Sequence, residues 1–312
     1  MLQKSGHGSY VDLPNGETYL VHLTSRPFVP ELRCTLGRET AIQKMQWTSD
    51  GWLRMADGSN LAKIEAEEPN LPDVPMPEIP NFDDFDGGEL GNWYYSPRQM
   101  PSTFANATER PGWLRVRGEE SLASLNRTSL LTRKLTSVYA TVTTKMEFEP
   151  EVYQHSAGLT IYYDNMNNIF LRKYYSQTLG GSAISIVRLE NGEKMEMLDT
   201  RVAVEDKPIY FRLNIEAVAL GSNGVMMARI GPRSVRISIP PRSLTNTASS
   251  VSSPALWSVL PSLMLRCMRR PPILISSIMR RTKRSLSTDP SGRPPRSFND
   301  PDPVVIRFRA AV

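Results

Sequence analysis

The sequence predicts an all-β protein whose strands form two separate parts. Short runs of alternating apolar and polar residues recur along residues 9–63 and again along residues 81–216, and this period of two is typical of half-buried strands. Turn sequences rich in Gly, Asn and Asp separate the runs. No segment keeps the 3.6-residue period of an amphipathic helix, and 25 Pro and 19 Gly favour a chain with many turns.

The first part contains two predicted hairpins. Residues 9–24 alternate on both sides of a Pro-Asn-Gly-Glu turn at 14–17, and residues 40–63 repeat the form around Ser-Asp-Gly at 49–51. Two hairpins make about one blade of a β-propeller. Residues 1–64 therefore hold enough strands for about one such blade and no more.

Residues 65–80 carry five Pro and almost no periodicity, which predicts a semi-rigid extended linker. The next domain is predicted to span residues 81–219. Its short strands turn repeatedly, and the clearest hairpin signal is Glu-Asn-Gly-Glu at 190–193. Antiparallel strands at this spacing predict a β-sandwich. The expected strands are 113–117, 140–148, 159–163, 169–175, 183–189 and 209–215.

Cysteine content and hydropathy narrow the protein class. The two cysteines, Cys34 and Cys267, lie far apart in sequence, so we expect reduced thiols and no disulfide framework. The sequence has no apolar run of 18 residues, so no transmembrane helix is expected. The N-terminus lacks the apolar core of a secretory signal, which favours a cytoplasmic over a secreted location.

Charge is distributed unevenly along the chain. Residues 221–312 hold 15 of the 37 Lys and Arg but only three of the 32 acidic residues, a net charge of +12, so the remainder carries −7. Such an Arg-rich, Ser-rich and Pro-rich tail over 220–312 is one signature of nucleic-acid or membrane binding. It has no strand or helix period, and we expect it to be irregular and disordered.

Several motifs in one continuous order carry a family resemblance. GHGS at 6–9, TLGRETAIQ at 35–43 and WTSDGWLR at 47–54 precede the linker, and FDDFDGGELGNWYYSPR at 82–98 and SAGLTIYYDN at 156–165 follow it. Together they resemble the C-terminal part of family 43 glycoside hydrolases of the β-xylosidase type. The resemblance covers about residues 5–216. It implies a five-bladed β-propeller catalytic domain, of which residues 1–64 are the C-terminal remnant, followed by a concanavalin A-like (jelly-roll) sandwich.

The resemblance implies inverting hydrolysis of β-xylosides, often with α-L-arabinofuranosides as second substrates. Inversion needs a general acid and a general base on opposite sides of the sugar. In the family these carboxylates lie upstream of the GHGS motif, so no catalytic residue is assigned here, and we expect a C-terminal fragment that is inactive alone. The alternative is a non-catalytic carbohydrate-binding or structural sandwich module.

Two residues are carried over by the resemblance as substrate-binding candidates. Arg38 occupies the place of the family's GRET arginine, whose guanidinium fork suits paired sugar hydroxyls. His7 occupies the place of the GHGS histidine near the propeller axis. The alternatives are a surface ion pair of Arg38 with Glu39 and a loop histidine satisfied by backbone groups.

The cofactor and partner predictions also follow from the resemblance. No metal ligand is assigned and no cofactor is expected, although a Ca²⁺ ion near the propeller axis is compatible with the full-length family. The expected ligands are xylo-oligosaccharides or arabinoxylan-derived sugars, with neither nucleic acid nor membrane as a partner.

The resemblance stops abruptly near residue 220, and the genetic code suggests why. Codons for residues 221–231 can be chosen so that a frame two bases later encodes KQWSYDGEDW, and residues 270–280 similarly permit TAYFDFFDYE. The same offset at Pro254 and Ala255 permits Thr-Gly. These are the missing family motifs in the right order, so we predict that residues from about 220 are a frameshifted or mis-spliced translation.

Overall fold

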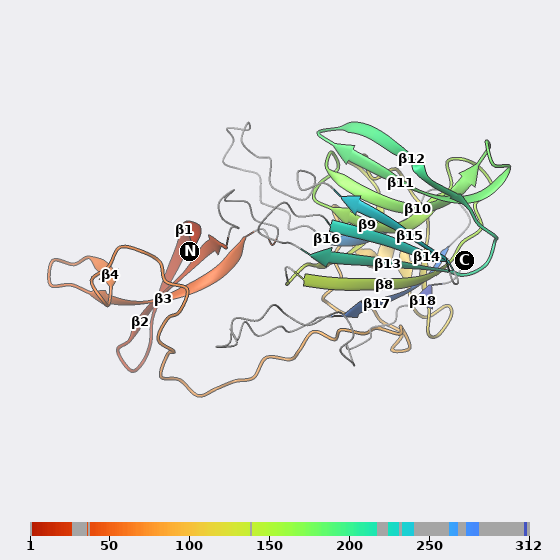
Figure 1. Cartoon of the computed structure of the whole chain (residues 1–312). Helices are drawn as coiled ribbons and strands as arrows, with labels where there is room; N and C mark the ends of the chain where they lie inside the picture. Colours follow the sequence, from red (N-terminus) through yellow and green to blue (C-terminus); the bar gives the residue numbers. More distant parts are fainter. Residues whose placement is uncertain are drawn as a thin grey trace, which may run out of the picture. The chain divides into compact units, whose positions relative to one another are not determined.

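A computed structural model describes residues 2–26, 36, 38–137, 139–216, 224–230, 233–239, 262–267, 273–280 and 309–310. The chain divides into two compact units, Met1–Glu78 and Ile79–Ala217, and strands from later in the chain join the second. The described elements are strands and one short 3-10 helix, η1 (Pro101–Thr103), which confirms the all-β prediction (Figure 1). No described helix is long and apolar enough to cross a membrane.

The first unit contains a four-stranded antiparallel sheet in the order β1-β2-β3-β4. Both predicted hairpins are present. Gly16 (φ +86°) and Gly51 (φ +79°) close their turns in the left-handed region, where a side chain would be strained. That this sheet ends a propeller stays a prediction. The strands are β1 (Gln3–Asp12), β2 (Thr18–Ser25), β3 (Glu39–Trp47) and β4 (Leu53–Met55).

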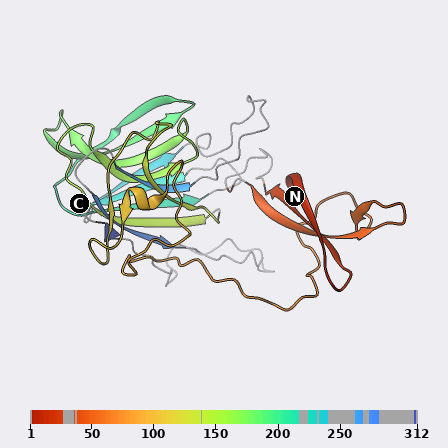
Figure 2. The same cartoon turned by 180° about the vertical axis from the view of Figure 1, so that it is seen from behind.

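The second unit is the predicted β-sandwich, and its described strands pair antiparallel except for β18 with β8 (Figures 1 and 2). One sheet has six strands in the order β12-β11-β10-β9-β16-β7, and the other has eight in the order β15-β14-β13-β8-β18-β17-β6-β5. The strands before residue 217 are β5 (Ala105–Asn106), β6 (Leu114–Val116), β7 (Ser129–Lys134), β8 (Tyr139–Glu147), β9 (Ser156–Tyr162), β10 (Asn168–Ser176), β11 (Gly181–Glu190), β12 (Glu193–Ala203) and β13 (Ile209–Glu216).

The hydrophobic core follows from strand alternation on the two sheets. Leu171 on β10 is opposite Ile186 on β11, and both are fully buried. On the other sheet, Phe211 and Leu213 of β13 are equally buried on the face that they share with Val142 of β8. Burial of such apolar faces is the main stabilising term of a sandwich.

The tail is where the structure differs from the sequence-based expectation of an irregular segment. Five described strands lie within 220–312, and two of them pair with strands from before residue 217 on both sides: β16 pairs with β7 and β9, and β17 pairs with β6 and β8. Their sequences, SLMLRC and ILISSIMR, are short and apolar, and such runs pair readily with an open strand edge. The rest of the tail, with Cys34 and Gly37, lies outside the described residues. The strands are β14 (Gly224–Ile230), β15 (Arg233–Ile239), β16 (Ser262–Cys267), β17 (Ile273–Arg280) and β18 (Arg309–Ala310).

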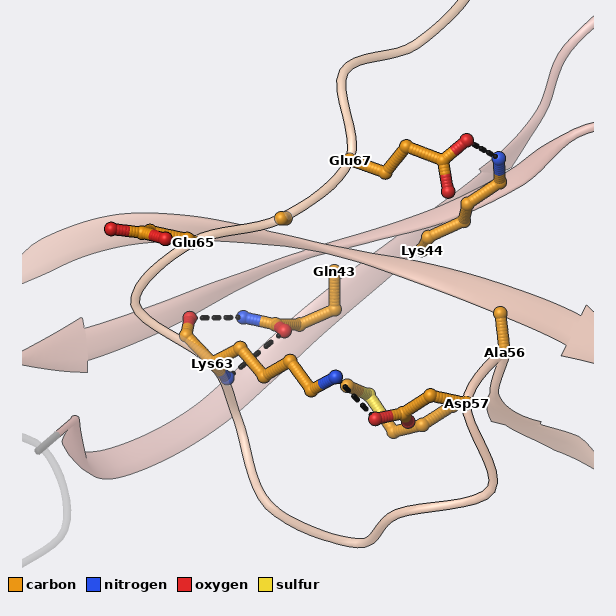
Figure 3. A pocket seen from close by; sticks show the side chains of 9 residues that line it. Gln43, Lys44, Ala56, Asp57, Lys63, Glu65 and Glu67 are labelled. Atoms are coloured by element: carbon orange, nitrogen blue, oxygen red, sulfur yellow. Dashed lines mark hydrogen bonds and ion pairs between the residues drawn. The ribbon is translucent and has the colours of Figure 1, made fainter.

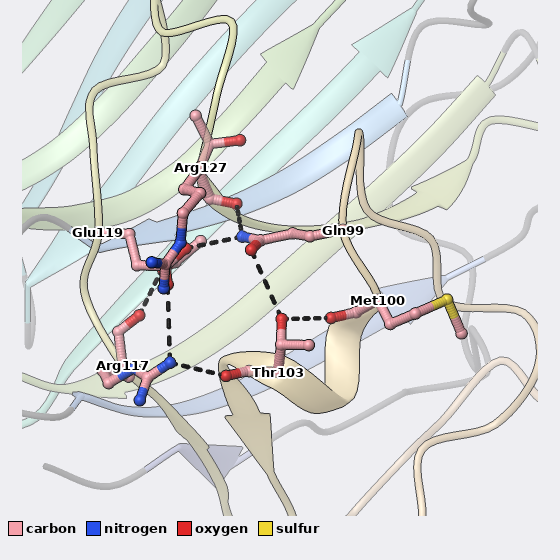
Figure 4. Close-up of polar contacts among 8 residues, drawn as sticks. Gln99, Met100, Thr103, Arg117, Glu119 and Arg127 are labelled. Carbon is pink, nitrogen blue, oxygen red and sulfur yellow. Dashed lines mark hydrogen bonds and ion pairs between the residues drawn. The ribbon is translucent and has the colours of Figure 1, made fainter.

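A buried carboxylate fastens η1 to the sandwich (Figure 4). Glu119 accepts hydrogen bonds from Arg127 Nη2 (2.6 Å) and from Gln99 Nε2 (2.7 Å). Arg117 lies 3.6 Å from the same carboxylate and donates to the Thr103 carbonyl at 2.8 Å. Because hydrogen bonds to charged groups are stronger than neutral ones, this network fixes the segment before β7.

Candidate functional site

His7 lies in an irregular stretch of β1. The pairing of β1 with β2 shifts register between Gln3 and Gly6 and again between Gly6 and Ser9. His7 is exposed and has φ +47°, in the left-handed region that costs energy for a residue with a side chain. Bulges of this kind re-aim side chains and occur often beside active sites.

Arg38 directly precedes β3 and is exposed. Its sequence neighbour Glu39 is engaged by Arg26, whose Nη2 and Nε donate to the carboxylate at 2.6 and 3.0 Å. The surface ion pair considered as the alternative role of Arg38 is therefore made by Arg26 instead.

Strand pairing places His7 and Arg38 near the same end of the β1–β4 sheet. Leu23 of β2 is paired with Gly6 on one side and with Thr40 on the other. Since neighbouring strands lie about 5 Å apart, the backbones next to His7 and Arg38 are separated by about 10 Å across β2. No described contact joins the two side chains directly.

A buried polar pair that sequence reasoning missed lies further along the sheet. His22 is 5% exposed, and its Nδ1 lies 2.9 Å from the Leu23 carbonyl oxygen. If that nitrogen donates, Nε2 accepts from the amide of Gln43 at 3.3 Å. His22 and Gln43 are 21 residues apart, so no local pattern could have revealed the pair.

The first unit also has a pocket of about 230 Å³ (Figure 3). Gln43 and Lys44 of β3, the segment after β4 and residues 63–67 form its walls. Its charged groups are largely paired with one another: Lys63 with Asp57, and Lys44 with Glu67. Neither His7 nor Arg38 lines it, so it is distinct from the predicted sugar site.

The described residues offer no metal centre. No group of three His, Cys, Asp or Glu side chains among them could hold an ion. The acidic stretch that begins at Asp83 forms turns instead: Asp83 accepts from the Phe85 amide at 2.9 Å and Asp84 from the Asp86 amide at 3.2 Å. Asp83 and Asp84 thus bind backbone amides of their own turns.

Comparison with known proteins identifies the family. Residues 1–53 match the model of glycosyl hydrolases family 43, and residues 82–233 match the β-xylosidase C-terminal concanavalin A-like domain. The chain belongs to glycoside hydrolase family 43. The first match includes the GHGS and GRET motifs with His7 and Arg38. The second extends past residue 220, where the resemblance in sequence had seemed to stop.

Relatives of the family 43 chain agree with this assignment. A β-xylosidase of Bacillus subtilis is 33% identical over 228 residues, which are 69% of this chain and 42% of that protein. A xylan 1,3-β-xylosidase of a Vibrio species is 32% identical over 246 residues, 74% of this chain and 45% of that protein. Among solved structures, a xylan β-1,4-xylosidase from Bacillus halodurans superposes with a TM-score of 0.76 at 33% identity, over 88% of this chain and 52% of that one. The chain thus spans about half the length of the relatives it matches.

Proposed function

We propose that this family 43 chain belongs to a glycosidase that releases xylose or arabinose units from xylo-oligosaccharides or arabinoxylan-derived sugars. The match of residues 1–53 to the catalytic family carries the proposal, because that segment contains both substrate-binding candidates. The β-xylosidases among its relatives support xylosides as the substrate class, and an α-L-arabinofuranosidase of Bacteroides ovatus, 29% identical, supports arabinofuranosides.

Arg38 has the chemistry to bind the sugar. It is exposed at the end of β3 while Arg26 occupies its neighbouring carboxylate, so its guanidinium can donate paired hydrogen bonds to adjacent hydroxyls. His7 faces the ligand from the bulged part of β1 and helps to orient it. The general acid and base of inversion are not assigned to residues of this chain.

The sandwich is proposed as the support of the catalytic domain. The second candidate is that it binds carbohydrate independently, as a module of its own. The two-sheet fold with its own hydrophobic core favours an independent unit, but a core alone does not make a sugar site. If the sandwich is only a support, binding of xylo-oligosaccharides depends on Arg38. If the sandwich binds carbohydrate by itself, that binding does not depend on Arg38.

Replacement of Arg38 by alanine is expected to weaken binding of xylobiose by about 10- to 100-fold, because hydrogen bonds from a charged donor contribute about 1.5–3 kcal/mol. The affinity of Arg38→Lys for xylobiose should fall between those of the unmodified chain and of Arg38→Ala, since an ammonium cannot reproduce the guanidinium fork. Isothermal titration of the full chain measures both. Arg54→Ala removes an exposed arginine of the same sheet and serves as the control.

Binding that is unchanged in Arg38→Ala would place the sugar on the sandwich and reject the proposed role of Arg38. Hydrolysis of an aryl β-D-xyloside by residues 1–312 alone would show that the chain contains an acid and base after all.

A further inference from the structure

His22 lies beside the irregular stretch of β1 that carries His7. The register of β1 against β2 shifts between Gly6 and Ser9. The two residues between them, which we call the bulge, are His7 and Gly8, and both lie opposite His22 of β2. A Cβ added at Gly8 would lie 3.7 Å from the Cβ of His22. A buried histidine is thus the β2 neighbour of an exposed candidate for sugar contact.

The hydrogen bonds of His22 fix its protonation state. Its Nδ1 lies 2.9 Å from the Leu23 carbonyl oxygen, which can only accept, so Nδ1 carries the proton. The side-chain amide of Gln43 is oriented by Lys63: its oxygen accepts from the Lys63 amide at 3.1 Å, and its NH2 group donates to the Lys63 carbonyl at 3.0 Å (Figure 3). The second N–H of that NH2 group is left for His22 Nε2, which lies 3.3 Å away and must accept.

Protonation of His22 would set two donors against each other. Nε2 would then carry a hydrogen directed at the NH2 group of Gln43. Gln43 cannot turn its oxygen toward the imidazole without losing both of its bonds to Lys63. Since His22 is 5% and Gln43 2% exposed, water cannot easily take the place of the lost partner. The hydrogen bonding of this site therefore requires a neutral imidazole.

The charged groups around His22 do not compensate an imidazolium. Both described hydrogen-bond contacts of His22 are with uncharged groups. On β3, the carboxylate of Glu39 is already engaged by an arginine. Beyond Gln43, the ammonium of Lys63 is a cation. The titratable groups of the adjoining part of β1 are Lys4 and His7, and neither is an anion.

We propose that His22 is a positioning residue of the sugar site and that the sugar binds only while the His22 imidazole is neutral. The inference rests on the proposed function, because it takes His7 and Arg38 as the sugar contacts. The neutral ring links the β2 backbone at Leu23 to Gln43 of β3. Loss of this link loosens β2 next to the bulge and so alters the spacing of His7 and Arg38. His22 itself does not touch the sugar.

Sugar binding is therefore expected to weaken in acid. The affinity of the full chain for xylobiose should fall at least about tenfold from about pH 7.5 to about pH 5, the range in which imidazoles become protonated. His22→Gln cannot titrate, so it should bind about threefold more weakly at pH 7.5 and show no such fall. His7→Asn removes the exposed imidazole of the bulge and keeps a side chain that tolerates positive φ. It should bind more weakly but retain the fall. Isothermal titration at each pH measures all three chains.

Imidazole NMR tests the coupling of His22 to the bulge without any sugar. Long-range ¹⁵N–¹H spectra of the full chain should show His22 neutral at neutral pH, with its proton on Nδ1. As His22 becomes protonated, the amide signals of Gly6 and Gly8 should shift with the same midpoint as its ring. Gly51, in the turn of the other hairpin, is the control and should not follow that midpoint.

The positioning role is supported if acid weakens binding in the unmodified chain and in His7→Asn but not in His22→Gln. It is rejected if the affinity of the unmodified chain is constant with pH or if His22→Gln retains the fall. It is also rejected if His7→Asn abolishes the fall, which would assign the titration to His7.

Two further outcomes are decided by the unmodified chain. Should His22→Gln not fold, the midpoint of the affinity change must coincide with that of the His22 ring, and a different midpoint rejects the role. If the unmodified chain does not bind xylobiose at pH 7.5, the proposed function fails. The coupling of His22 to the bulge is then supported if the Gly8 signal follows the His22 titration and rejected if it does not.

Discussion

Replacing Lys173 by alanine is expected to lower the free energy of unfolding of the sandwich by about 3 kcal/mol. Lys173 on β10 is fully buried; its ammonium donates to the Phe148 carbonyl at 2.7 Å and lies 3.0 Å from Asp206. Alanine leaves a cavity in place of the methylene stem and an unpaired carbonyl in the interior. Both are costly, whereas the half-exposed Asp206 regains water.

Lys173→Met separates these two costs. Methionine fills most of the space but cannot donate to Phe148, so a loss of about 1–2 kcal/mol is expected. Lys194→Ala, an exposed position on β12, is the matched control. Urea denaturation followed by tryptophan fluorescence measures all three. A loss in Lys173→Ala no larger than in the control would contradict the buried role of this lysine.

The Lys173→Met substitution should also change the pKa of the neighbouring Asp206. Burial by itself would raise the pKa of Asp206, but hydrogen bonds from Ser182 and Lys173 outweigh it and hold the pKa below its usual value. In Lys173→Met the pKa of Asp206 should therefore rise, which NMR titration can detect.

Gly158→Ala is expected to lower the free energy of unfolding of the sandwich by more than about 3 kcal/mol, or to prevent its folding. Gly158 lies on β9 opposite Arg172 of β10. A Cβ built there would lie 1.9 Å from the Leu171 carbonyl oxygen and 2.9 Å from the Cα of Arg172. Both are backbone atoms of an inner strand, so relief would require the two strands to separate and lose their hydrogen bonds.

Gly181→Ala is the control for Gly158→Ala. Gly181 also lies in a strand of this sheet, at the beginning of β11, and a Cβ there meets nothing within 4 Å. Its stability should change by less than about 1 kcal/mol. Equal stability of the two variants in urea denaturation would show that β9 and β10 accommodate the methyl group.

We propose that the sequence after about residue 220 is translated from a shifted frame. The motifs expected from the family reappear in one alternative frame, whereas the match to the family domain in the present frame ends at residue 233. Without the later strands, one edge each of β7, β8 and β9 would offer unpaired backbone N–H and C=O groups, with which a short apolar segment can pair. Sequencing of the transcript decides: a shifted frame without the YDGE and aromatic-acidic motifs would refute the proposal.

Local patterns in the sequence were sufficient for most strands. Alternation and the Asn191-Gly192 turn predicted the β11–β12 hairpin, where the structure pairs Glu190 with Glu193. Strand β7 was missed, because SLLTRK does not alternate: five of its six residues are buried on a strand covered on both faces. The short η1 was missed as well, since three residues carry no period.

The sequence by itself determined the all-β class, the two hairpins, the sandwich and the family, because these depend on local periodicity, turn chemistry and contiguous motifs. Only the tertiary structure decided which side chains meet across long separations. In the structure His22 contacts Gln43, and Glu39 is paired with Arg26 rather than with Arg38. Lys63, just before the predicted linker, is hydrogen-bonded to Gln43 of the sheet. Such contacts depend on strand register and chain path, which no short window of sequence contains.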